Sequence, residues 1–191
     1  MMGRVILAVS GASGAELALE VAKVLRRTSV AVDLVLSSMA ERTLVLEIGP
    51  EAHGELVSLV DCLHPISDLG ATLGSGSYPV AGMIVAPCSM RSLAAIAQGL
   101  DDNLLTRAAS VQLKERRPLV LLAREAPLTL AHLRNMTAVT EMGGIIMPPV
   151  PAFYLLPKTI EDITTQIAAR AVDLLRLAPP QAKPWAPPNG E

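Results

Sequence analysis

The feature that most constrains the fold is a regular alternation between short β-branched runs and longer stretches with the apolar spacing of a helix. The first unit contains an apolar run at 4–9, a turn of small residues at 10–14 and a helical pattern at 15–27. Strands buried on both faces give near-continuous apolar runs, and consecutive parallel strands need a crossover, usually a helix, between them. The alternation therefore predicts an α/β fold in which helices cover both faces of a mainly parallel sheet.

The rest of the chain repeats this pattern with one gap. Strands are expected at 31–36, 82–86, 119–123 and 145–147, and helices at 39–47, 89–98, 103–114, 129–142 and 159–175. Only a short strand at 59–63 is placed in the weakly patterned stretch 48–78. Four prolines within 148–157 exclude regular structure there. The last helix is expected to bury a stripe made of Ile160, Ile163, Ile167 and Leu174.

Composition favours one α/β domain at 1–177 followed by a Pro-rich, extended tail at 178–191. A chain of 191 residues with 51% apolar residues can bury one large core. The 16 Lys and Arg residues nearly balance the 18 Asp and Glu residues, so no charge excess attracts nucleic acid or a membrane. The two cysteines, Cys62 and Cys88, fit neither a disulfide framework nor a zinc motif, and no apolar run is long enough for a signal segment or a membrane span. We therefore expect a cytoplasmic protein.

The turn from Ser10 to Gly14 is the first candidate binding element. Small residues let a ligand approach the backbone, and the N–H groups that start the following helix attract an anion such as a phosphate. Ser37 and the turn Pro87-Cys88-Ser89 follow other strands, so they are expected at the same edge of the sheet. A plain tight turn and helix-capping serines would show the same residues, and both interpretations stay open.

Longer motifs are more specific than this turn. They are 86–93 (APCSMRSL), 102–109 (DNLLTRAA), 113–120 (LKERRPLV), 124–128 (REAPL) and 148–154 (PPVPAFY). With the turn at 10–14 they extend over nearly the whole chain in one order. In this combination the sequence resembles the UbiX flavin prenyltransferase family.

The resemblance implies a Rossmann-like three-layer sandwich that assembles into a homododecamer with active sites at subunit interfaces. It also implies transfer of a dimethylallyl group from dimethylallyl monophosphate to N5 and C6 of reduced FMN. The prenylated FMN would then pass to a partner decarboxylase of the UbiD type. No metal is expected, because Asp101-Asp102 is followed by Asn103 and has no further carboxylate in the DDxxD spacing with which diphosphate prenyltransferases commonly hold Mg²⁺.

The same resemblance assigns site residues by position. FMN contacts fall on Gly11, Ala12, Ser13, Ser37, Cys88, Ser89, Met90, Arg91 and Arg124. The prenyl phosphate would be surrounded by Lys114, Glu125, Tyr154 and Arg170, and Glu47 would line the site. Catalytic roles are implied for Ser13, Glu47, Lys114, Glu125, Tyr154 and Arg170. We expect Glu125 to exchange a proton with the phosphate or, through Ser13, with the flavin.

Simple structural roles compete with several of these assignments. Arg170 shares the helical stripe of Ile163 and Ile167, so its guanidinium is expected to face buried surroundings, where a structural ion pair is the alternative. Tyr154 could be a core tyrosine. For the run 114–117 the alternative is a solvated helix end, and we keep that interpretation for Arg116 and Arg117.

The sequence also departs from the family pattern. Met39 stands where many members have a basic residue, and Arg91 where many have lysine. The family's C-terminal region can place a tryptophan near the active site, which would correspond to Trp185; a disordered tail is the alternative.

Two other functions remain open. An FMN-dependent decarboxylase of the cysteine-decarboxylase type would need an active-site histidine and a Pro-x-Met-Asn segment. His53 and His64 lie in the weakly patterned stretch, and Asn135-Met136 lacks the surrounding motif. An FMN-binding subunit of an aromatic-acid decarboxylase complex is the second alternative.

Overall fold

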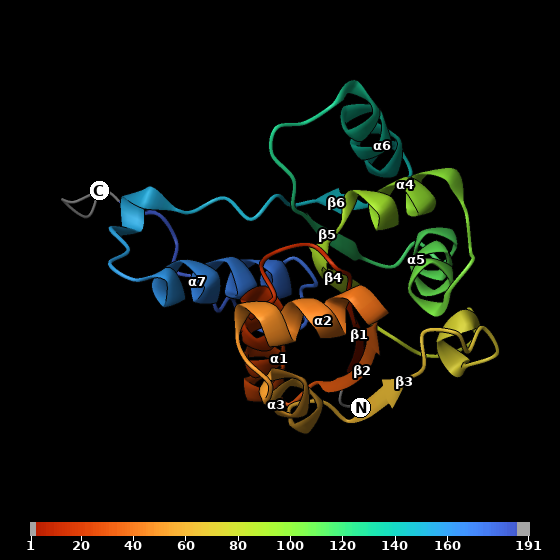
Figure 1. The fold of residues 1–191 in the computed structure, drawn as a ribbon, viewed down its shortest axis with the longest axis horizontal. Coiled ribbons are helices and arrows are strands. Elements are labelled where there is room, and N and C mark those ends of the chain that lie inside the picture. Colours follow the sequence, from red (N-terminus) through yellow and green to blue (C-terminus); the bar gives the residue numbers. More distant parts are fainter. Residues whose placement is uncertain (1–2, 187–191) are drawn as a thin grey trace.

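The computed structural model describes residues 3–186 (Figure 1). Its sheet has six parallel strands in the order β3-β2-β1-β4-β5-β6. They are β1 (Arg4–Val9), β2 (Ala31–Leu36), β3 (Cys62–His64), β4 (Gly82–Cys88), β5 (Leu119–Ala123) and β6 (Ile145–Ile146). This is the doubly wound arrangement, in which strand order reverses between β1 and β4 and a crevice opens at their carboxyl ends.

Helices cover both faces of the sheet, as Figure 1 shows. One face packs against α1 (Glu16–Arg27), α2 (Ser38–Glu47), α3 (Ala52–Ser58) and α7 (Ile160–Asp173). The other packs against α4 (Met90–Gln98), α5 (Leu104–Lys114) and α6 (Leu130–Glu141). The Rossmann-like three-layer sandwich predicted from the sequence is therefore confirmed.

Alternation along the strands divides the buried side chains into two cores. In β1, Val5, Leu7 and Val9 belong to the core shared with α1 and α7, whereas Ile6 and Ala8 belong to the core shared with α4 and α5. Successive side chains of a strand point to opposite faces, so each strand contributes to both cores. This double burial explains why β1, β2 and β5 read as nearly uninterrupted apolar runs.

The structure corrects the predicted elements in three places. The weakly patterned stretch contains α3, and its strand lies at Cys62–His64 rather than at 59–63. The proline-rich loop includes one short 3₁₀ turn, η2 (Phe153–Leu155). Ile160 is 78% exposed, because burial on α7 begins only at Thr164, one turn further along.

The chain after α7 turns back along that helix. Asp173 and Gln166 form hydrogen bonds with backbone groups of residues 181–183, so this part of the tail is held against the domain. The predicted tail also includes residues 187–191, which lie outside the described part of the chain. Within residues 3–186, no helix is both long and apolar enough to cross a membrane.

Candidate functional site

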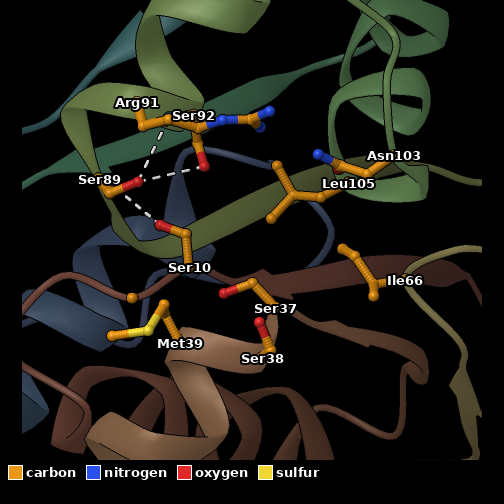
Figure 2. Close-up of a pocket in the computed structure, with 11 residues that line it drawn as sticks. Ser10, Ser37, Ser38, Met39, Ile66, Ser89, Arg91, Ser92, Asn103 and Leu105 are labelled. Carbon is orange, nitrogen blue, oxygen red and sulfur yellow. Dashed lines mark hydrogen bonds between the residues drawn. The ribbon is translucent and has the colours of Figure 1, made fainter.

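A cavity of about 400 Å³ opens at the point where the strand order reverses (Figure 2). Its lining includes Ser10 after β1, Ser37 and Ser38 after β2, and Ser89 and Arg91 after β4. These residues are far apart in sequence and meet because carboxyl ends of parallel strands share one edge. Of the predicted FMN contacts, Gly11, Ser37, Ser89 and Arg91 are brought together here. We call this cavity the crevice.

The Ser10 hydroxyl ties the two central strands together at the bottom of the crevice. Its Oγ donates to the carbonyl of Pro87 at 2.9 Å and accepts from the N–H of Ser89 at 2.7 Å. Ser10 is only 2% exposed, so both bonds are shielded from water. Sequence pattern alone assigns no separate role to Ser10, since an isolated serine after a strand has many uses.

Two helix starts face each other across the crevice. Ser37 caps α2 by accepting from the N–H of Ala40 at 3.1 Å, and Ser89 caps α4 by accepting from the N–H of Ser92 at 3.3 Å. The capping interpretation is therefore correct for both serines. Other first-turn N–H groups of a helix lack intrahelical partners and carry partial positive charge, which makes this edge suited to an anion.

The turn at 10–14 has a structural reason for its two glycines. A Cβ on Gly11 would lie 2.3 Å from the Cβ of Met39, so α2 could not approach this closely with any other residue. Gly14 has φ +104°, in the region that disfavours a side chain. Ala12 and Ser13 complete the turn, with Ser13 exposed.

The side chain of Glu47, the last residue of α2, binds the backbone at the start of α1. Its Oε2 accepts hydrogen bonds from the N–H groups of Gly14 and Ala15, both at 2.8 Å. Partial burial acts to raise the pKa of Glu47, but the hydrogen bonds from Ala15, the Ser13 hydroxyl and Gly14, together with the charge of Arg124, lower the pKa below its usual value. The amides that the sequence offered to a phosphate are thus bonded to a carboxylate.

Cys88 is not among the residues that line the crevice. Its side chain is fully buried in the core beneath α4, and burial raises the pKa of the thiol to about 12, against a smaller lowering by the hydrogen bond from Leu93. The carbonyl of Cys88 accepts from the N–H of Arg124 at 3.0 Å, which fixes the start of the 124–129 loop beside the crevice. Met90 packs partly into the same core.

A second cavity of about 470 Å³ lies beside α7. Its lining includes Tyr154 from η2, Arg170 from α7 and Trp185 from the tail. We call it the α7 pocket. Arg170 is exposed, so the expected buried guanidinium is wrong, and it forms no ion pair within residues 3–186. Tyr154 is 53% exposed and is not a core residue.

Lys114 and Glu125 stay apart within one chain. Lys114 precedes β5 and pairs with Glu115, whereas Arg124 and Glu125 follow β5. The five residues of β5 separate these ends by about 17 Å at the usual rise per residue. Lys114 therefore belongs to the edge opposite the crevice. Glu125 is exposed and accepts from the neighbouring N–H of Ala126 at 3.0 Å.

Comparison with known proteins shows which family has this sequence and architecture. The model of the Flavoprotein family matches residues 2–172. The chain is 48% identical over 185 residues to flavin prenyltransferase UbiX of Neisseria meningitidis serogroup B, with 97% of each chain covered. The chain belongs to the UbiX flavin prenyltransferase family.

Solved structures of this family superpose closely on the chain. AnUbiX (PadA1), described in complex with FMN and dimethylallyl pyrophosphate, has a TM-score of 0.93 and 44% identity over 98% of this chain and 99% of that one. A dodecameric FMN-dependent UbiX-like decarboxylase from Escherichia coli O157:H7 has a TM-score of 0.91 and 43% identity, over 96% and 100%. The family resemblance predicted from the motifs is confirmed.

One cluster outside these cavities has metal-ligating side chains. Donor atoms of Asp33, Cys62 and His64 lie within 4.8 Å of one another on β2 and β3. Asp33, however, already accepts from Arg4 at 2.9 Å and from the Tyr78 hydroxyl at 3.0 Å. The arginine neutralises the carboxylate, and of the three residues only Asp33 is buried, so the cluster is a polar network around one buried aspartate. Sequence spacing did not reveal it, because its members come from two strands.

Proposed function

We propose that this protein is a flavin prenyltransferase that transfers a dimethylallyl group from dimethylallyl monophosphate to N5 and C6 of reduced FMN. The observation that carries the proposal is the pairing of an anion-suited crevice with a separate cationic α7 pocket, in a chain 44% identical to a protein described with FMN and dimethylallyl pyrophosphate. The prenylated flavin would be released to a UbiD-type decarboxylase, and a cytoplasmic location is part of the proposal.

The crevice fits FMN through its own groups. We place the flavin phosphate near the starts of α2 and α4, where Ser37, Ser89 and Arg91 surround the cavity. Arg91 is paired with Asp102, so its guanidinium is held at the rim and would exchange this partner for the phosphate. The start of α1 is a poorer phosphate site, because Glu47 already binds its amides. Further flavin contacts are assigned from the family resemblance, to residues that lie at or after the carboxyl ends of the strands. They are Gly11, Ala12, Ser13, Cys88, Met90 and Arg124.

The α7 pocket fits the phosphate of the prenyl donor. Arg170 carries a charge with no carboxylate partner in the described residues, and the Tyr154 hydroxyl can donate a second hydrogen bond. Both would offset the charge that grows on the phosphate as the carbon–oxygen bond breaks. FMN, when bound in reduced form, supplies the nucleophilic atoms. Glu125 and Glu47 are the carboxylates available to carry protons beside them.

Lys114 would enter this site from another copy of the chain. It lies at the opposite edge of the protomer's own sheet, which a shared site between subunits accommodates. We therefore propose a homododecamer, the assembly described for the Escherichia coli O157:H7 relative. Light scattering on the purified protein tests it, and a stable, active monomer would exclude it.

The decisive experiment is a product mass. Anaerobic incubation of the protein with reduced FMN and dimethylallyl monophosphate is expected to give a flavin heavier by one five-carbon unit. Parallel reactions with the diphosphate show which donor is preferred. Arg170→Ala is expected to raise the KM for the donor about 10- to 100-fold while FMN stays bound, because one charged contact is lost. Arg176→Ala, which removes an exposed charge just beyond α7, is the control.

A decarboxylase activity is the second candidate, because the Escherichia coli relative is described as an FMN-dependent UbiX-like decarboxylase. The protein would then release CO₂ from an aromatic acid in the presence of FMN and without a second protein. CO₂ release only after a UbiD-type decarboxylase is added supports the prenyltransferase, and release by the purified protein alone supports the alternative.

A further inference from the structure

One wall of the α7 pocket is formed by the segment 179–185, which we call the strap. The strap contains no helix or strand, and its backbone is held by side chains of α7. Asp173 accepts from the N–H groups of Gln181 and Ala182, at 2.7 and 3.0 Å. Gln166 accepts from the N–H of Lys183 and donates to its carbonyl, both at 3.0 Å.

These two holding side chains lie on either side of Arg170. Gln166 precedes it by four residues and Asp173 follows it by three, so all three occupy one face of the helix. The strap thereby passes over Arg170 and brings Lys183 and Trp185 into the wall of the pocket that Tyr154 and Arg170 line. The position of this wall depends on side chains that themselves lie at the edge of the pocket.

The strap has little else to hold it in place. Lys183 and Trp185 are exposed, and of the residues bound by Asp173 and Gln166 only Ala182 packs partly on the core. Fixing the backbone of a few residues costs conformational entropy of the same order as a few exposed hydrogen bonds supply. Removing the bonds from one of the two side chains is therefore enough to shift the strap toward release.

We propose that Asp173 and Gln166 are positioning residues for the prenyl donor: they lie at the edge of its pocket and act on the donor by holding the strap as a wall of that pocket. The proposal rests on the proposed function, in which the α7 pocket receives the allylic phosphate. Without the strap, the donor keeps Arg170 and Tyr154 but loses the enclosure that keeps water from them. Affinity for the donor then falls, whereas FMN binding in the crevice is unchanged.

The test combines kinetics with a reporter in the strap itself. Trp185 is the sole tryptophan, so its fluorescence anisotropy reports the strap alone. For Asp173→Ala and Gln166→Ala we expect lower anisotropy and about a tenfold higher KM for dimethylallyl monophosphate, with kcat and FMN affinity unchanged. Asp173→Asn keeps one carbonyl acceptor and is expected to fall between Ala and wild type.

A matched control is Asp61→Ala. It also removes a carboxylate that accepts a backbone N–H, that of Val32 at 2.7 Å, but at the far edge of the sheet. It is expected to leave both the anisotropy and the donor KM at wild-type values. A similar rise in KM for Asp61→Ala would assign the effect to general destabilisation and overturn the proposal.

The remaining outcomes separate the two proposals. Unchanged anisotropy in Asp173→Ala, or a wild-type donor KM despite lower anisotropy, overturns the role of the strap and leaves the function standing. If the wild-type protein forms no heavier flavin, the proposed function fails. Calorimetric titration with dimethylallyl monophosphate then tests whether the strap contributes to binding of that compound. Weaker binding by Asp173→Ala than by wild type supports it, and equal or absent binding overturns it.

Discussion

The crevice and the α7 pocket are held in place by different parts of the fold. Crevice residues such as Ser10 and Ser92 are 2% and 5% exposed and sit on strand ends and capped helices. The α7 pocket is lined by Tyr154 and Trp185, which are 53% and 64% exposed and belong to a proline-rich loop and the strap. The difference indicates that flavin binding is tied to the core, whereas donor recognition combines Arg170 on the core-packed helix α7 with segments that can change without repacking the sheet.

The largest expected effect is on the rate of turnover, and it comes from a substitution that leaves the shape of both cavities unchanged. Glu125→Gln is expected to lower kcat about a hundredfold, the usual scale for losing a proton-transfer group. Melting temperature and FMN content should stay at wild-type values, because Glu125 forms no ion pair within residues 3–186. Product is followed by mass spectrometry, with Glu141→Gln as a surface control. A wild-type rate would remove the proton-transfer role, and lost FMN would point to a structural one.

A smaller effect is expected from a substitution that distorts the crevice by steric overlap. Gly11→Ala places a Cβ 2.3 Å from that of Met39, so α2 must shift. We expect a loss of about 1–3 kcal/mol in the free energy of unfolding and weaker FMN binding, measured by denaturant titration and flavin fluorescence. Gly54→Ala meets nothing within 4 Å and lies inside α3, so it is expected to be neutral or stabilising by about 0.5–1 kcal/mol. Unchanged FMN affinity in Gly11→Ala would argue against the crevice as the flavin site.

A still smaller effect concerns pH and Glu47. Because its folded pKa is lowered, Glu47 stabilises the protein at pH above its unfolded pKa, and this contribution is lost as pH falls through the folded value. Because Glu47 is exposed, solvent screens this effect, so Glu47→Gln should cost less than about 1 kcal/mol at neutral pH and nothing in strong acid. Urea unfolding of both proteins across a pH series measures the difference. A gap that widens on acidification would contradict the assignment.

The smallest effect distinguishes the two cysteines. Cys62 is exposed, whereas Cys88 is fully buried with its pKa raised to about 12 by that burial. Iodoacetamide is expected to label Cys62 in the native protein and Cys88 only after unfolding, because the thiolate is the reactive form. Peptide mass mapping gives the ratio. Rapid native labelling of Cys88 would mean that the crevice opens into the core beneath it.

The sheet was the most predictable part of the molecule. The bounds of β1, β2 and β5 match the expected strands, because burial on both faces removes polar residues from the run. The helix α3 was missed because only Ala52 and Leu56 are buried and Gly54 lies within it, which leaves no apolar stripe. The domain boundary at 177 stays a prediction.

The site was predictable only where it follows strand ends. Ser37 and Ser89 come together for that reason, whereas the bonds that hold the strap run to backbone groups and leave no mark in the sequence. The order of residues along the chain already implies that Lys114 lies far from the crevice. Lys114 precedes β5, whereas Arg124 follows the other end of that strand. Arg170 is exposed because the buried side of α7 runs through Ala168, Ala171 and Val172, which leaves Arg170 on the outward side. Its helical spacing from Ile163 and Ile167 alone does not show this.

The membership of β1 in two cores has a consequence for how the chain unfolds. Because Ile6 and Ala8 support one layer while Val5 and Leu7 support the other, neither layer can melt while the other keeps its strand intact. Unfolding is therefore expected as one cooperative transition across the three layers. Ser10 at the end of this strand lines the crevice, so a ligand bound there would raise the melting temperature of the whole domain. Thermal stability thus becomes a measure of flavin occupancy.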